Sequence, residues 1–146
     1  MSATITRANV VNAARAWVGT PFHHQARERG VGVDCVGLII GVARDLGLVA
    51  EDFDVPVYGR MPDGVSLMEA AHLHMTPVTF GNMRAGDVVV VSFDSHPQHF
   101  GILAPYQHGG HAIIHAAQKH GRVVETRLMF HTAMRFEAAF ALPGVN

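Results

Sequence analysis

The sequence predicts an α+β domain in which helices precede a mainly antiparallel sheet. Two patterns support this prediction: apolar residues recur at helical spacing as far as Met75, and short apolar runs separated by Gly, Pro or polar residues follow from Gly86 onward. With 146 residues, of which 49% are hydrophobic, the chain is long enough to bury a core of its own. We therefore expect one domain spanning residues 1–146, without a linker or an internal repeat.

Three helices are expected in the N-terminal half. The expected segments are helices at 6–17, 36–46 and 65–75, a polar loop at 22–33 and irregular chain at 49–63. Thr6 is a possible cap of the first helix. The second helix is apolar almost all round, which is typical of a helix buried on most sides, and Asp34 and Gly47 are suitable residues to begin and end it.

Five strands are expected in the C-terminal half, joined as an antiparallel meander. They span residues 86–93, 99–105, 111–117, 122–128 and 134–142. If the turn between the second and third strands is centred on Gln107, His99 lies directly opposite His115, and the two imidazoles are close enough to hydrogen-bond. We expect one face of this sheet to pack on the second helix, with His99 facing Cys35.

Cys35 is the only cysteine, and it lies at the predicted start of the second helix. Free N–H groups and the helix dipole favour a thiolate there, but a helix end supplies only about 0.3–1 kcal/mol, up to about 2. Lowering a cysteine pKa from about 8.5 to about 5 requires roughly 4–5 kcal/mol. A nucleophilic Cys35 therefore needs a histidine, with His99 as the base and His115 as the residue that orients its ring.

Composition excludes several other classes of protein. Eleven basic and twelve acidic residues give a net charge of -1, so nothing indicates a nucleic acid or an anionic membrane as partner. The N-terminus lacks the features of a secretory signal, and no apolar run approaches the ~20 residues of a membrane span. We expect synthesis in the cytoplasm and no insertion into a membrane. A single cysteine excludes an internal disulfide and a thiolate zinc cluster.

The eleven histidines raise the alternative of a metal-dependent hydrolase. His96 and His99 are three residues apart on a Pro-containing turn, without the third well-spaced ligand that catalytic zinc requires. His72 and His74 are two residues apart and cannot share a helix face. We therefore expect neither a metal nor another cofactor.

Five motifs resemble, in the same order, those of the NlpC-type cell-wall cysteine peptidases. They occupy residues 19–22, 32–38, 84–88, 99–103 and 113–116. The resemblance implies a papain-like fold, in which the nucleophile begins a central helix packed on an antiparallel sheet of five to six strands. It also implies hydrolysis of an amide bond in peptidoglycan stem peptides, typically between D-γ-glutamyl and a diamino acid. By motif match, Cys35 is the nucleophile, His99 the base and His115 the orienting residue.

Within that family the sequence is most similar to the phage branch, which is encoded in tail gene clusters and in phage-like gene transfer particles. This similarity rests on His-Gln-Ala at 24–26, Val-Val-Glu at 123–125 and the spaced phenylalanines of 136–140. It implies a virion component that binds tail hub or tail-tip proteins. Such a component would be carried in the tail and would act at the host cell wall.

The expected substrate cleft contains two departures from the family pattern. The residues expected to bind substrate are Phe22, His24, Gln25 and Asp34. Many family members have Tyr where this chain has Phe22, so one hydroxyl donor near the nucleophile is missing. Val36 replaces a frequent Ser, but its backbone N–H can still contribute to an oxyanion hole. The alternative prediction is therefore a structural tail-tip component that plugs or caps the tube, with little or no activity.

Overall fold

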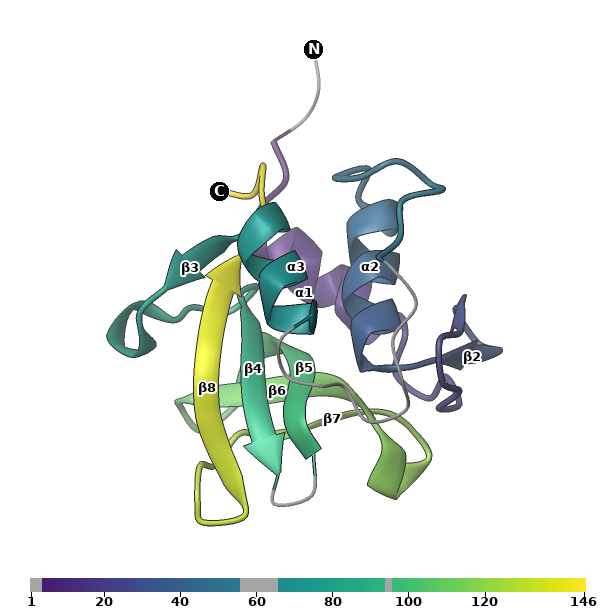
Figure 1. Cartoon of the computed structure of the whole chain (residues 1–146). Coiled ribbons are helices and arrows are strands. Elements are labelled where there is room, and N and C mark those ends of the chain that lie inside the picture. The colour runs from purple at the N-terminus through teal and green to yellow at the C-terminus, as the bar shows by residue number, and fades with distance from the viewer. Residues whose placement is uncertain (1–3, 56–65, 94–95) are drawn as a thin grey trace.

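The computed structural model describes residues 4–55, 66–93 and 96–146. Within these residues, three α-helices pack beside a six-stranded antiparallel sheet (Figure 1). The strand order is β3-β8-β4-β5-β6-β7, and a separate two-stranded hairpin, β1-β2, lies beside the start of α2. The α+β class and the sheet of five to six strands are thus confirmed.

The helices form where capping residues and apolar periodicity predict them. They are α1 (Arg7–Arg15), α2 (Cys35–Asp45) and α3 (Ser66–His74). Thr6 caps α1 through a reciprocal pair of hydrogen bonds with Asn9, of 3.1 and 2.9 Å. Gly47, just beyond α2, has φ +69°, a conformation that ends helices and favours glycine. The expected start of the third helix, at residue 65, lies outside the described residues.

The sheet strands follow the predicted apolar runs, with two additions. They are β3 (Thr76–Val78), β4 (Val88–Phe93), β5 (His96–Pro105), β6 (His111–Ala117), β7 (Arg122–Arg127) and β8 (Met134–Ala141). Short 3-10 helices, η1 (Phe80–Asn82) and η2 (Gln118–His120), precede β4 and β7. The edge strand β3 and the hairpin of β1 (Arg27–Glu28) and β2 (Gly32–Val33) were not predicted.

The predicted meander is wrong at its last strand. Strands β4 to β7 are consecutive neighbours, but β8 pairs with β4 and not with β7. All four valines at the start of β4 are 0% exposed, so its backbone groups are buried and must be paired along both edges. β5 satisfies one edge of β4, and β8 satisfies the other.

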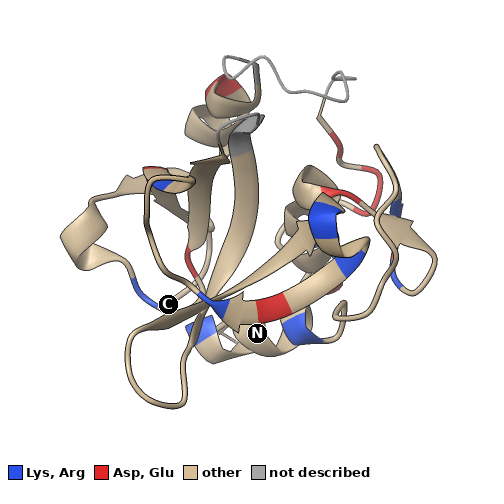
Figure 2. Cartoon of the chain, turned by 90° about the horizontal axis from the view of Figure 1, so that it is seen from below, with Lys and Arg blue, Asp and Glu red and all other residues tan. Residues whose placement is uncertain are grey.

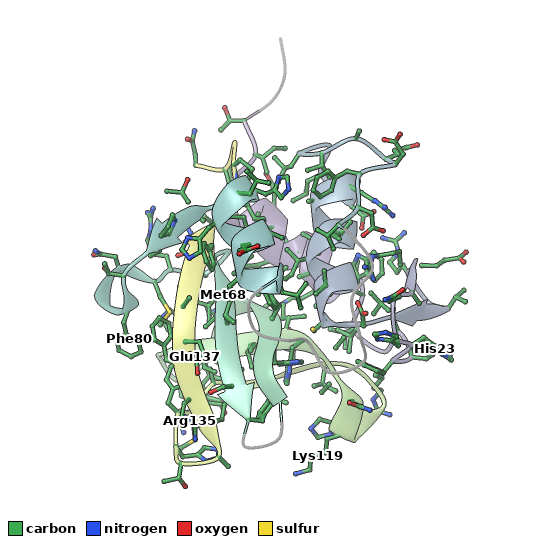
Figure 3. All side chains as sticks on the ribbon, in the orientation of Figure 1. His23, Met68, Phe80, Lys119, Arg135 and Glu137 are labelled. Carbon is green, nitrogen blue, oxygen red and sulfur yellow. The ribbon has the colours of Figure 1, made fainter. Side chains whose placement is uncertain are left out.

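Apolar side chains fill both faces of the sheet. Along β4, Val88 and Val90 join the larger core with α1 and α2, whereas Val89 and Val91 join a smaller core on the opposite face. The Phe136 ring packs against this smaller core, and the exposed ring of Phe80, which is labelled in Figure 3, lies 5.1 Å from it between centroids. The central strands β4, β5 and β6 are therefore buried on both faces of the sheet, and α2 lies against the face of the larger core.

Charges are interspersed on the ribbon, as Figure 2 shows. The C-terminal residue lies beside the segment that precedes α1, because Asn146 donates a backbone hydrogen bond to the Ile5 carbonyl at 2.9 Å. Across the described ranges, every helix is too short or too polar to cross a membrane.

Candidate active site

Cys35 is the first residue of α2, as predicted. Asp34 is the N-cap in extended conformation, and its carboxylate accepts a 2.8 Å hydrogen bond from the Gly37 N–H. A Cβ at Gly37 would lie 2.4 Å from the carbonyl oxygen of Ala26, so the first turn of α2 packs directly against the preceding loop. The glycine in this motif is therefore required by that close approach.

The Asp34 carboxylate also holds that loop. It is 3% exposed and accepts hydrogen bonds from the Gln25 N–H at 2.7 Å and from the Arg27 guanidinium at 2.9 Å. The imidazole of His24 lies 3.9 Å from the same carboxylate. Asp34 thus lies beneath the site and supports it, and substrate contact at this residue stays a prediction.

Gln25 is the only non-glycine residue with positive φ in the described ranges, at +60°. This left-handed conformation is costly for a residue with a Cβ, and here the hydrogen bond to Asp34 maintains it. Strained backbone of this kind is frequent at functional sites. The strained backbone of Gln25 is therefore consistent with a role at the site, which its residue type alone did not indicate.

Phe22 and His24 begin and continue the same loop. Phe22 packs against the larger core, and its N–H donates to the Gly121 carbonyl at 2.8 Å. His24 is partly buried, whereas His23 between them is exposed and points outward in Figure 3. Three of the residues predicted to bind substrate therefore lie in one loop that contacts the cap of α2.

The two histidines of the sheet meet as expected. Nε2 of His99 on β5 lies 2.7 Å from Nδ1 of His115 on β6, and the residues are 8% and 5% exposed. Their rings are edge-on, with centroids 4.9 Å apart. The predicted contact between the two imidazoles is confirmed.

The predicted strand register behind that contact is wrong by two residues. Ile102 pairs with Ile114, where the prediction placed Ala112. The difference arises in the turn, which includes both Gly109 and Gly110 at positive φ and closes with a hydrogen bond from the Tyr106 N–H to the Gly110 carbonyl. A shift of two residues preserves the face of every side chain, so the imidazoles still meet.

The expectation that His99 faces Cys35 stays a prediction. His99 lies opposite Val91, a residue of the smaller core, whereas the next residue, Phe100, packs in the core beneath α2. The β4–β5 register shifts between Val91 and Phe93, beside His99, so regular alternation along the strand does not fix the direction of the His99 ring. The Phe93 ring, 5.3 Å from that of His99, belongs to the same smaller core.

The sulfur of Cys35 lies beside β5, near the point where the pairing of β5 with β6 ends. Leu103 donates its N–H to Asp87, on the β4 side, so the N–H of Phe100 points toward β6. The β5–β6 ladder ends at the pair Ile102–Ile114, and the Phe100 N–H is directed instead at the Cys35 sulfur. Cys35 therefore lies beside the strand residue that follows His99.

Burial raises the pKa of the Cys35 thiol to about 11. N–H groups of Phe100, Val36 and Cys35 itself oppose this change, and the nearby Asp34 carboxylate adds to it. Cys35 is partly exposed but packs against the larger core. The helix start therefore does not produce a resting thiolate, and activation requires a base.

Burial, followed by the nearby His120, lowers the pKa of His115 to about 4. His115 is therefore neutral near pH 7, and its Nδ1 can accept a proton shared by Nε2 of His99. That tautomer leaves Nδ1 of His99 as the ring nitrogen that can receive a proton. The pair thus has the arrangement of a base and the group that orients it.

Acid should weaken the fold through His115. As pH falls below 6.5, the unfolded histidine binds a proton, whereas the folded one stays neutral until about pH 4. Stability from this residue is fully present above pH 6.5, and about 3 kcal/mol is lost by pH 4. Urea unfolding at about pH 6.5 and about pH 4 measures this loss of unfolding free energy. We expect a smaller loss for His115→Asn than for wild type, and a loss equal to that of wild type for the exposed His108→Asn. Equal losses in all three proteins would contradict this burial effect.

Two site residues escaped sequence analysis. The guanidinium of Arg27 binds the Asp34 carboxylate, and the backbone N–H of Phe100 points at the Cys35 sulfur. Neither Arg nor Phe is a residue type expected as a partner of a catalytic cysteine. Arg27 could have been proposed from the sequence, because a basic residue that precedes an N-cap aspartate by seven positions is a possible ion-pair partner of that aspartate. In the described residues, His, Cys, Asp and Glu side chains form no group of three or more suited to a metal ion, and the side chain of His96 lies outside them.

Comparison with known proteins gives the same fold. The structure is similar to the NlpC/p60 domain of the peptidoglycan hydrolase SagA, with a TM-score of 0.64 and 20% identity over 94% of this chain and 100% of that one. It is also similar to the P60 domain of an M. avium subspecies paratuberculosis antigen (TM-score 0.57, 15% identity, 94% of each chain). An N-acetylmuramoyl-L-alanine amidase from Bacteroides uniformis aligns over 93% of this chain and 98% of its own, with a TM-score of 0.58 and 9% identity.

A sequence comparison with curated proteins gave no match. The family model described as "NlpC/P60 family" matches residues 19–136, which include the loop before α2, Cys35 and both buried histidines. The match spans far more than half of the sequence, and therefore the chain belongs to the NlpC/P60 family.

Proposed function

We propose that this protein is a cysteine peptidase that hydrolyses an amide bond in the stem peptides of peptidoglycan. The observation that carries the proposal is the arrangement of Cys35 at the start of α2, beside the strand that bears the hydrogen-bonded His99–His115 pair. Membership of the NlpC/P60 family supports the cell-wall substrate. In this proposal Cys35 is the nucleophile, His99 the base and His115 the orienting residue.

The reaction begins from a neutral thiol, because burial raises the pKa of Cys35. As the sulfur forms a bond to the substrate carbonyl carbon, the thiol proton passes to Nδ1 of His99. The resulting oxyanion is stabilised by N–H groups at the start of α2, including that of Cys35. His99 then gives the proton to the departing amine, and the C–N bond breaks to leave a thioester.

Water completes the cycle by attacking the thioester. His99 takes a proton from the water, the C–S bond breaks, and the proton returns to the sulfur as the carboxylic acid product leaves. His115, which remains neutral above about pH 4, holds the Nε2 proton of His99 through both steps. No step requires a metal or another cofactor.

The substrate is tested with purified sacculi. Wild-type protein should release soluble fragments, and mass spectrometry should find a new amino terminus within the stem peptide. We propose the bond between D-γ-glutamyl and a diamino acid, with Phe22, His24, Gln25 and Asp34 as the residues that form or support the substrate cleft. Release of fragments cut in the glycan, or no release by the wild-type protein, would overturn the proposal.

We further propose that the protein is carried in the tail of a phage or phage-like particle and is bound there by tail hub or tail-tip proteins. The sequence motifs at 24–26 and 123–125 support this context. Proteomic analysis of purified particles from a producing strain should find the chain in the tail fraction. Its recovery only from the cell lysate would contradict this localisation.

The second candidate function is a structural tail-tip component that plugs or caps the tube. Two observations favour it: burial raises the pKa of the only thiol, and Phe22 lacks the hydroxyl that many family members have near the nucleophile. Neither removes the histidine pair, so the peptidase remains the better-supported function.

Alkylation of Cys35 by iodoacetamide distinguishes the two functions. If His99 accepts the thiol proton, we expect wild-type protein to react below pH 7 at least about tenfold faster than His99→Gln. A plug predicts the same rate for both proteins, with reaction rising only at high pH because burial keeps the thiol protonated. Equal profiles would therefore exclude the peptidase and leave the plug.

A further inference from the structure

The loop before α2 contains a charge network that the proposed reaction does not use directly. Arg27, on β1, donates from Nη1 to the Asp34 carboxylate at 2.9 Å and from Nε and Nη2 to the Asp54 carboxylate at 3.2–3.3 Å. Its side chain is 12% exposed, so the guanidinium is held between two acidic residues with little access to water. A second bond from Nη1, to the Ala26 carbonyl at 3.0 Å, fixes the plane of the guanidinium.

The Asp54 carboxylate is also close to a second arginine. Arg44, on α2, lies 3.5 Å from Asp54 and donates to the carbonyl of Phe53. A continuous series of contacts therefore runs from Arg44 through Asp54 and Arg27 to Asp34, the N-cap of the cysteine helix. A planar guanidinium can bond both carboxylates at once, which an ammonium group on one flexible stem does less well.

The position of Arg27 bears on the first turn of α2. Asp34 uses one oxygen, Oδ1, for both Arg27 and the Gly37 N–H, and the other for Gln25. A Cβ at Gly37 would lie 2.8 Å from Nη1 of Arg27, so the guanidinium packs directly on the turn that begins with Cys35. Removing it would leave the buried carboxylate next to the nucleophile without its cationic partner.

We propose that Arg27 is a positioning residue for Cys35: by bridging Asp34 and Asp54, it fixes the cap of α2 and neutralises the carboxylate beside the thiol. This inference rests on the proposed function for its catalytic consequence, although its effect on the thiol exists without substrate. Loss of Arg27 leaves Asp34 to repel negative charge on the sulfur. The reactions of Cys35 should therefore slow, while substrate affinity changes little.

Arg29 provides a matched control. It belongs to the same β1–β2 loop, is 56% exposed, and lies 3.8 Å from Asp45. We expect Arg27→Met to lower kcat on a stem-peptide substrate by about 10- to 100-fold with KM nearly unchanged, and to slow Cys35 alkylation below pH 7 by a similar factor. Arg29→Met should match wild type in both measurements.

A second pair of variants, with lysine in place of each arginine, controls for misfolding of the methionine variants. Arg27→Lys retains the charge but bonds one carboxylate at a time, and we expect its alkylation rate to lie between those of wild type and Arg27→Met, with Arg29→Lys at the wild-type rate. Thermal unfolding identifies any variant that fails to fold, and the lysine pair then decides. Wild-type alkylation rates in both Arg27 variants, or equal slowing in the Arg29 variants, would overturn the proposal.

Alkylation needs no substrate, so the two hypotheses can fail separately. If wild-type protein does not hydrolyse peptidoglycan but Arg27→Met still slows alkylation, the proposed function fails and the positioning role stands. If wild-type protein is active and Arg27→Met is equally active and equally reactive, the positioning role fails alone.

Discussion

Cys35→Ser should abolish hydrolysis of peptidoglycan and leave the fold intact. We expect kcat to fall by roughly 10⁴-fold or more, because a hydroxyl is a far weaker nucleophile and the rest of the site was built for a thiol. Cys35 is partly exposed, and a serine oxygen can still accept the Phe100 N–H, so the free energy of unfolding should change by less than about 1 kcal/mol. Fragment release from sacculi and urea unfolding check the two halves of the prediction.

The control for this variant is the neighbouring Val36→Ser, which restores the residue frequent in related sequences without touching the thiol. It should retain activity within about tenfold of wild type, since the proposed role of residue 36 is a backbone N–H. Activity of Cys35→Ser equal to that of wild type would exclude Cys35 as the nucleophile.

The second large effect is expected at the histidine pair. His99→Gln should lower kcat by about 10²–10⁴-fold, because it removes the only group proposed to move protons. His115→Asn keeps an acceptor near Nε2 of His99 and should lose less activity than His115→Leu, which removes it. Steady-state kinetics on a synthetic stem peptide measure all three variants.

The order of the two His115 variants is the informative result. A residue that only fills space would be replaced better by leucine, whereas one that holds a proton would be replaced better by asparagine. Greater activity in His115→Leu than in His115→Asn would contradict the orienting role. The exposed His108→Asn, on the β5–β6 turn, should match wild type.

Local chemistry allowed the helices and most strands to be predicted. Thr6 and Asp34 are capping residues that act within three positions, and Gly47 ends α2 through its own backbone. The valines of β4 and the run at the start of α2 carry enough apolar surface to identify buried elements. The contact between His99 and His115 was predicted although the register was not, because a shift of two residues keeps both imidazoles on the same face.

Features that depend on distant segments could not be predicted. The pairing of β8 with β4 and the bridge from Arg27 to Asp34 and Asp54 depend on backbone and charges brought together only by the folded chain. The contact of the Cys35 sulfur with the Phe100 N–H could not be predicted either, because it lies where the β5–β6 ladder ends. The burial that raises the pKa of Cys35 likewise depends on packing by distant segments.

The central claim is that one sulfur atom performs the hydrolysis, and a titration tests it most directly. Because the chain has a single cysteine, intact-mass spectrometry counts the alkylated molecules, and the same samples can be assayed on a stem peptide. The account predicts that residual activity falls in proportion to the unmodified fraction and reaches zero when every molecule carries one adduct. Substantial hydrolysis by fully alkylated protein would contradict it.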